Sequence, residues 1–175
     1  MRDRIEAGIK AAGFNQPKKL YAVYYDGSSA FSCGGGAWPS TLVGNVGALY
    51  LHGMPPGAPA CSETPLATSE DHPGYWEFAL IHEIFHVLGA VARCAPHFTL
   101  EGHVSDSPND LMYAGDLVWE PSVLDISHDD YFDHNNAGCL DVAKSVFIQP
   151  TPRNAVPPPS WKTFAGKRRQ AHVRW

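Results

Sequence analysis

The sequence predicts a single α+β domain, in which one long helix covers a small mixed, twisted β-sheet and an irregular C-terminal part follows. Three observations favour this class. The chain has 175 residues, which suits one domain of ordinary size. Helical and strand patterns both occur in its first half. Its 16 glycines and 15 prolines indicate many turns and irregular loops. The domain is expected to span residues 1–149.

The N-terminal half carries one helical pattern and two strand patterns. Residues 2–12 repeat apolar side chains at helical spacing and are followed by a glycine that can end a helix. Residues 20–25, LYAVYY, are β-branched and aromatic, as a strand requires. Residues 46–52, VGALYLH, predict a second strand that ends before a glycine and two prolines. The intervening SCGGGAWPS lacks the lysine of a phosphate-binding loop.

The longest helical pattern runs over residues 74–89, GYWEFALIHEIFHVLG. Its buried face is expected to consist of Phe78, Ile81, Phe85 and Leu88. Beyond this helix the chain is rich in prolines, glycines and polar turns as far as Trp119. A short helix is expected around residues 122–133.

The residues HEIFH, 82–86, have the spacing of a metal site on a helix. Residues four apart lie on the same helix face, so the imidazoles of His82 and His86 can reach one ion. Glu83 would then lie beside the metal, where a carboxylate can act as a general base. Two histidines and a carboxylate in the most apolar helix of the chain would be costly without a partner. This turn therefore predicts a Zn²⁺ site.

HEIFHVLG resembles the start of the metzincin signature, H-E-x-x-H-x-x-G-x-x-H. In that clan of zinc metallopeptidases the glycine ends the helix, so that a third histidine can turn back to the metal. The later segment NDLMY, with Met112, is similar to the Met-turn beneath the zinc. The resemblance implies a metzincin-like fold: a long active-site helix above, an irregular subdomain with the Met-turn below, and one catalytic zinc ion between them.

The third ligand departs from the clan's pattern, because Ala92 stands where the third histidine is expected. The downstream candidates are His97, His103 and Asp106. We favour His103, since the stretch from it to Met112 is similar to the H-S-x-D-P-x-x-L-M segment of matrix-metalloprotease-like members. Residues 91–102 would then be an insertion between the helix and this ligand.

The resemblance implies that the protein hydrolyses bonds within a peptide or protein substrate. Zinc would lower the pKa of its bound water and polarise the substrate carbonyl. Glu83 would take the proton of that water and deliver it to the leaving amine. A metzincin also holds an extended substrate against the edge strand that precedes its active-site helix. The residues expected to bind substrate are Ala48, Leu49, Tyr50 and Leu51 on that strand and Tyr113 in the pocket wall.

Two other functions stay open at this point. A peptidase of the other large H-E-x-x-H class would take its third ligand from a later helix, and the downstream glutamates are Glu101 and Glu120. From a different class, the chain could be a non-catalytic secreted binding module with a structural or vestigial zinc site. A structural site fills all four metal positions and has no use for Glu83.

Acidic and histidine residues also cluster in the C-terminal part of the domain. The cluster consists of Asp125, His128, Asp129, Asp130, Asp133 and His134. Ca²⁺ prefers carboxylate oxygens, so this is a candidate second cation site, although its spacing is not that of an EF-hand loop. A solvated acidic helix start explains the same residues.

The cysteines favour an exported protein. Cys33, Cys61, Cys94 and Cys139 are an even, dispersed set without the paired spacing of a zinc or thiol-exchange motif. They allow three pairings. We favour Cys33–Cys61 and Cys94–Cys139, because each pair then closes a loop on its own side of the long helix. MRDRIEAG does not read as a signal peptide, so for a secreted chain we expect one to have been removed.

Charge is divided between the body and the tail of the chain. Residues 150–175 contain six of the 13 basic residues and no acidic residue. The rest of the chain contains the other seven basic residues and all 18 acidic residues. An acidic body argues against nucleic-acid binding. Five prolines at residues 150–159 predict a stiff linker before the basic end. No apolar run approaches the roughly 18 residues of a membrane span, and we expect a monomer.

Overall fold

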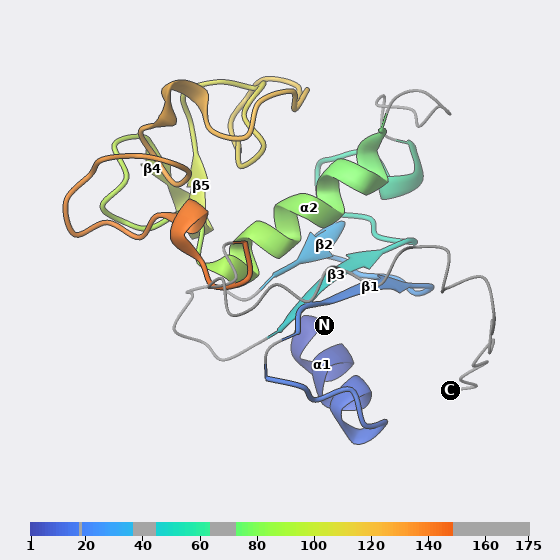
Figure 1. Cartoon of the computed structure of the whole chain (residues 1–175). Helices are drawn as coiled ribbons and strands as arrows, with labels where there is room; N and C mark the ends of the chain where they lie inside the picture. The colour runs from blue at the N-terminus through green and yellow to red at the C-terminus, as the bar shows by residue number, and fades with distance from the viewer. Residues whose placement is uncertain (18, 37–44, 64–72, 149–175) are drawn as a thin grey trace.

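The protein has a mixed α+β fold in which a three-stranded sheet lies between two helices (Figure 1). The computed structural model describes residues 1–17, 19–36, 45–63 and 73–148; the basic tail lies outside this range. The helices and strands are α1 (Arg2–Ala11), β1 (Tyr21–Tyr25), β2 (Gly34–Gly35), β3 (Val46–Tyr50), α2 (Tyr75–Leu88), β4 (Phe98–Thr99) and β5 (His103–Val104). Residues 90–148, which we call the C-terminal lobe, fold on the side of α2 away from the sheet (Figure 1).

Helix α1 covers one face of the sheet. Ile5 is buried against Val46, Ala48 and Tyr50 of β3, as expected from the helical spacing of its apolar residues. Glu6 is also buried, and it forms ion pairs with Arg2 and Lys10, one helical turn away on either side. The predicted N-terminal helix is confirmed.

Strand β3 lies in the centre of the sheet, with β1 parallel on one side and β2 antiparallel on the other. All five of its residues are buried. The prediction that residues 48–51 form the exposed edge for substrate is therefore wrong: Ala48, Leu49 and Tyr50 belong to the central strand, and Leu51 follows in a turn. The outer strand on that side is β2, whose glycines carry no alternating apolar pattern that could have predicted a strand.

Helix α2 begins and ends where the sequence predicts. The Glu77 carboxylate accepts a hydrogen bond from the Gly74 N–H at 3.0 Å and caps the N-terminus. Gly89 has φ 103°, a left-handed conformation that glycine adopts without strain, and its N–H bonds to the His86 carbonyl at 3.0 Å. Phe85 packs into the C-terminal lobe, but Ile81 is 44% exposed and does not belong to the buried face.

The C-terminal lobe is irregular, as expected, and has its own core. Val91, Val104, Met112, Tyr131 and Val142 are fully buried there. The helix predicted around residues 122–133 is absent from this described segment, which contains only a 3₁₀ turn at Ile126–His128. The Asp125 carboxylate explains the difference, because it accepts hydrogen bonds from the backbone N–H groups of Tyr131 and Phe132 and wraps the chain around itself.

Both predicted disulfides are present. Cys33–Cys61 joins the residue before β2 to a 3₁₀ turn at Cys61–Glu63, and Cys94–Cys139 links the segment after α2 to a position near the end of the lobe. Two disulfides are consistent with an extracellular protein. Within the described residues, no helix combines the length and apolar character needed to cross a membrane.

Candidate metal centre

Three histidines from two distant parts of the chain converge on one point. His82 and His86 lie one turn apart on α2, and His103 begins β5. Their Nε2 atoms are 3.1 Å apart between His82 and His86, 3.1 Å between His82 and His103, and 3.3 Å between His86 and His103. We call these three residues the histidine centre. The structure thus places His103, and neither His97 nor Asp106, beside the helical pair.

Each ring of the histidine centre is oriented by a backbone carbonyl. The Nδ1 of His82 bonds to the Leu111 carbonyl at 2.7 Å, that of His86 to the Ala90 carbonyl at 3.0 Å, and that of His103 to the Leu100 carbonyl at 2.8 Å. A carbonyl oxygen can only accept, so each Nδ1 must carry the hydrogen. In the neutral ring Nε2 then presents a bare lone pair, and all three lone pairs point toward one another.

This arrangement fits a metal ion. Burial lowers the pKa of all three imidazoles, that of His82 to about 4. The rings are therefore neutral near pH 7, and their Nε2 atoms carry no hydrogen. Ligands at a tetrahedral zinc with Zn–N distances of about 2.0–2.1 Å lie roughly 3.3 Å from each other, close to the spacing observed. The three residues could therefore hold a metal ion.

Glu83 lies beside the histidine centre under the glycines of residues 34–36. The Gly36 N–H donates a hydrogen bond to its carboxylate, while burial dominates and raises the pKa of Glu83 to about 8. A Cβ on Gly34 would lie 2.3 Å from Glu83 Oε1, and one on Gly36 would lie 2.5 Å from the Cβ of His86. Only glycine permits this contact between β2 and α2. The SCGGG pattern, which predicted a turn without the features of a phosphate-binding loop, could have indicated such a close approach.

Asp110 supports the histidine centre through the turn that follows it, a role that the sequence did not predict. Its buried carboxylate accepts hydrogen bonds from the Met112 N–H at 2.7 Å, the Tyr131 hydroxyl at 2.8 Å and the Ile126 N–H at 2.9 Å. These bonds hold the turn that carries Met112, which is fully buried, and the Leu111 carbonyl that orients His82. The motif NDLMY therefore contributes its aspartate as well as its methionine.

The histidine centre opens into a cleft of about 620 Å³. Aromatic side chains of Tyr75, Trp119 and Tyr113 line it, together with the glycines of β2 and Glu101. Tyr113 thus lies in the cleft wall, as predicted, and its hydroxyl accepts a hydrogen bond from the Leu117 N–H at 3.2 Å. Residues 48–51 do not line the cleft among the described residues.

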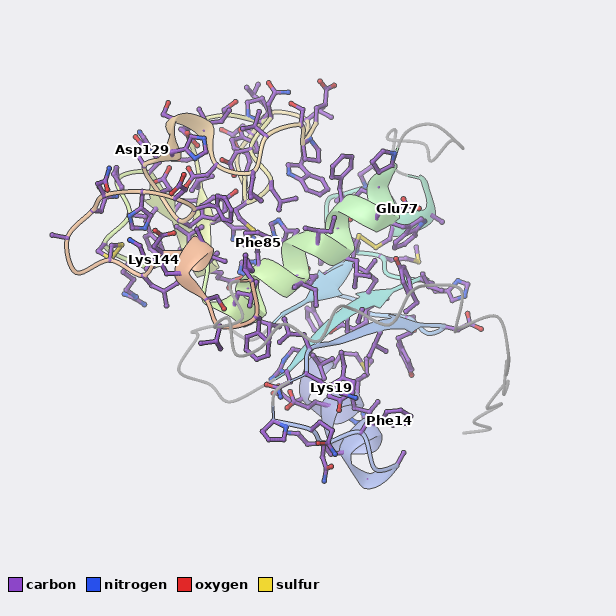
Figure 2. All side chains as sticks on the ribbon, in the orientation of Figure 1. Phe14, Lys19, Glu77, Phe85, Asp129 and Lys144 are labelled. Atoms are coloured by element: carbon purple, nitrogen blue, oxygen red, sulfur yellow. A yellow bond between two sulfur atoms is a disulfide. The ribbon has the colours of Figure 1, made fainter. Side chains whose placement is uncertain are left out.

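A second group of charged residues lies in the C-terminal lobe, where Figure 2 labels Asp129. The Asp130 carboxylate accepts a hydrogen bond from the His97 N–H at 2.8 Å and pairs with His97 Nδ1 at 2.9 Å, which raises the pKa of His97. Two sets here are close enough to hold an ion, namely His97, Asp106 and Asp130, and Asp125, Asp129 and Asp130. His128 and His134 bond instead to the carbonyls of Phe132 and Leu140.

No protein-family model, curated protein or solved structure matches this chain. The features of the molecule that bear on its function are the histidine centre, Glu83 and the cleft around them.

Proposed function

We propose that the protein is a zinc-dependent endopeptidase of the metzincin type. The observation that carries this proposal is the convergence of three Nε2 lone pairs beside a carboxylate, inside an open cleft. Three histidine ligands with a free fourth position are typical of catalytic zinc, whereas structural zinc sites fill all four positions with protein. Imidazole ligands suit zinc better than calcium or magnesium.

The residues around the centre have distinct roles in peptide hydrolysis. When bound, zinc would act as a Lewis acid on the scissile carbonyl and would make a water molecule more acidic. Burial raises the pKa of Glu83 to about 8 in the metal-free site, and a cation bound at the histidine centre would favour its carboxylate form. That carboxylate, on the same turn of α2 as the two histidines, would accept the proton of the attacking water and pass it to the leaving amine. The Gly36 N–H holds the Glu83 carboxylate in place for both transfers. Asp110 holds the turn that carries the buried Met112 and the Leu111 carbonyl that orients His82.

Strand β2 supports a path for the substrate. Among the described residues β2 pairs only with β3, so its other edge is free to accept an extended peptide by strand addition. Its residues Gly34 and Gly35 line the cleft, and the absence of side chains lets a peptide backbone approach closely. The substrate-binding strand in this proposal is therefore β2 and not residues 48–51.

Replacing Glu83 with glutamine tests the chemistry. Glu83→Gln keeps the shape of the side chain but removes the base, so zinc content should stay at one ion per chain while kcat falls at least about 100-fold. Zinc is measured by elemental analysis of the purified protein, and cleavage by a library of quenched fluorescent peptides. Wild-type rates in this variant would remove Glu83 from the mechanism. A wild-type protein that binds zinc but cleaves nothing would favour the binding-module alternative.

A matched pair of histidine variants tests the ligand set. His103→Ala should lose zinc under conditions where His97→Ala retains it, because His97 bonds to Asp130 and lies outside the histidine centre. Zinc loss in His97→Ala alone would contradict the ligand set proposed here.

A further inference from the structure

The cleft around the histidine centre is lined by acidic and neutral side chains. Among the described residues that line it, Glu101 and Glu83 are the carboxylates, and none is lysine or arginine. The surrounding sequence has the same character, because Arg93 and Lys144 are the only basic residues between positions 20 and 149. Of these two carboxylates Glu101 is the exposed one, and its negative charge can attract a ligand group of the opposite sign.

Glu101 is placed where its charge can act on a bound ligand. It belongs to a 3₁₀ turn, Leu100–Gly102, immediately before His103, and the Leu100 carbonyl of the same turn orients the His103 ring at 2.8 Å. Its side chain is exposed in the cleft, and among the described residues it has no hydrogen bond or ion pair. Within the described part of the chain its negative charge therefore has no ion-pair partner, unlike that of Glu6 or Asp130.

We propose that Glu101 determines substrate specificity by binding a lysine or arginine side chain close to the scissile bond. This inference rests on the proposed endopeptidase function and names the substrate class of the same site. The carboxylate supplies the partner for the cation, and the aromatic walls of Tyr75 and Trp119 can cover the aliphatic stem of a long basic side chain. The excess of acidic residues in the body attracts cationic peptides from a distance.

Charge-swapped peptides test the inference. Peptides that carry lysine, glutamine or glutamate at one position within three residues of the cut bond are compared at about 0.15 M salt. At one of these positions, the one that Glu101 contacts, the wild type should cleave the lysine peptide with a kcat/KM about five- to tenfold higher than that of the glutamate peptide. Glu101→Gln should abolish most of this ratio, and Glu101→Lys should reverse it. Glu120→Lys is the matched control, since Glu120 is exposed but does not line the cleft, and should leave the ratio unchanged.

Two further measurements keep the inference testable if a variant folds poorly. Glu101 has φ 58°, a left-handed conformation that glycine adopts without strain, so Glu101→Gly should fold and should also lose the lysine preference. In the unmodified protein the preference should weaken between 0.05 and 0.5 M salt, at about the ionic strengths where screening sets in. A preference that survives in both Glu101→Gln and Glu101→Gly would overturn the inference.

Binding to the zinc-loaded Glu83→Gln variant separates this inference from the endopeptidase proposal. Fluorescence anisotropy should give about five- to tenfold tighter binding of the lysine peptide than of the glutamate peptide. Charge-selective binding without any cleavage by the wild type would leave Glu101 as a specificity residue and would contradict the endopeptidase. Cleavage without charge preference at any position would support the endopeptidase and overturn the role of Glu101.

Discussion

Three backbone carbonyls determine how the histidine centre can bind an ion. Those of Leu111, Ala90 and Leu100 each take the hydrogen of one Nδ1, so that every Nε2 is left as an acceptor. None of the three is a side chain that sequence could single out. At the residue scale the site therefore depends on what holds these carbonyls in position, and for Leu111 that is the Asp110 carboxylate.

We expect Asp110→Asn to weaken both stability and zinc binding. The amide that replaces one carboxylate oxygen cannot accept, so at least one of the three buried donors, Met112 N–H, Ile126 N–H or the Tyr131 hydroxyl, loses its partner. The cost should be about 2 kcal/mol in the free energy of unfolding. The shifted Leu111 carbonyl should also lower zinc affinity about tenfold. Urea titration and competition with a chelator measure the two effects.

Asp116→Asn is the control for this prediction, because Asp116 is exposed and makes no hydrogen bond through its side chain among the described residues. Equal effects of the two substitutions would show that Asp110 has no special part in holding the site.

At the scale of elements, two segments reach the histidine centre from opposite sides of α2. Strand β2 covers Glu83 through its glycines and is tied by Cys33 to Cys61. The segment between Gly89 and His103 supplies the third histidine and is tied by Cys94 to Cys139. In the proposed chemistry, Cys33–Cys61 therefore supports the strand over the general base Glu83, and Cys94–Cys139 supports the segment that carries the metal ligand His103.

The two disulfides should differ in what their loss changes. Each closes a loop, over sequence separations of 28 and 45 residues, so each double alanine variant should lose about 3–4 kcal/mol of stability. Cys33→Ala with Cys61→Ala should lower kcat and keep zinc affinity, because β2 loosens over Glu83. Cys94→Ala with Cys139→Ala should lower zinc affinity, because the His103 segment loosens.

Each pair serves as the control for the other, with kcat and zinc affinity measured at a temperature where both variants are folded. Parallel changes of both parameters in both variants would contradict the division of roles between the two segments.

At the scale of the whole molecule, the C-terminal lobe is held by long-range polar contacts more than by secondary structure. The pair His97–Asp130 joins residues 33 positions apart in sequence. Asp130 raises the pKa of His97 above its usual 6.5, mainly through this hydrogen bond, with Asp106 and Asp129 adding to the effect from 4.0 and 3.9 Å. A raised pKa in the folded state means that folding favours protonated His97.

The stability of the lobe should therefore fall as the pH rises. The contribution of His97 is fully present below pH 6.5, the value for the unfolded chain, and is lost as the pH passes through the higher pKa of the folded state. Urea midpoints of the wild type and His97→Gln should differ clearly near pH 6 and less at pH 8. A difference that grows with pH would contradict the sign of this effect.

Local patterns in the sequence were sufficient for most of the regular structure. The bounds of α1, β1, β3 and α2 lie within two residues of those predicted, because apolar spacing and the glycines after each segment act locally. The sequence did not predict β2, because its two glycines have no side chains that could show the alternating apolar pattern of a strand. It also did not place β3 in the centre of the sheet, which depends on which strands pair with it.

The same division applies to the site. Helical spacing alone places His82, Glu83 and His86 on one turn of α2, because a helix fixes the relation between residues four apart. Only the tertiary structure shows that His103, and neither His97 nor Asp106, lies beside His82 and His86. The N–H of Val104 pairs with the Met112 carbonyl at 3.0 Å and brings His103 to the helix, while Asp130 draws His97 away. Such contacts join residues distant in sequence, and no local spacing encodes them.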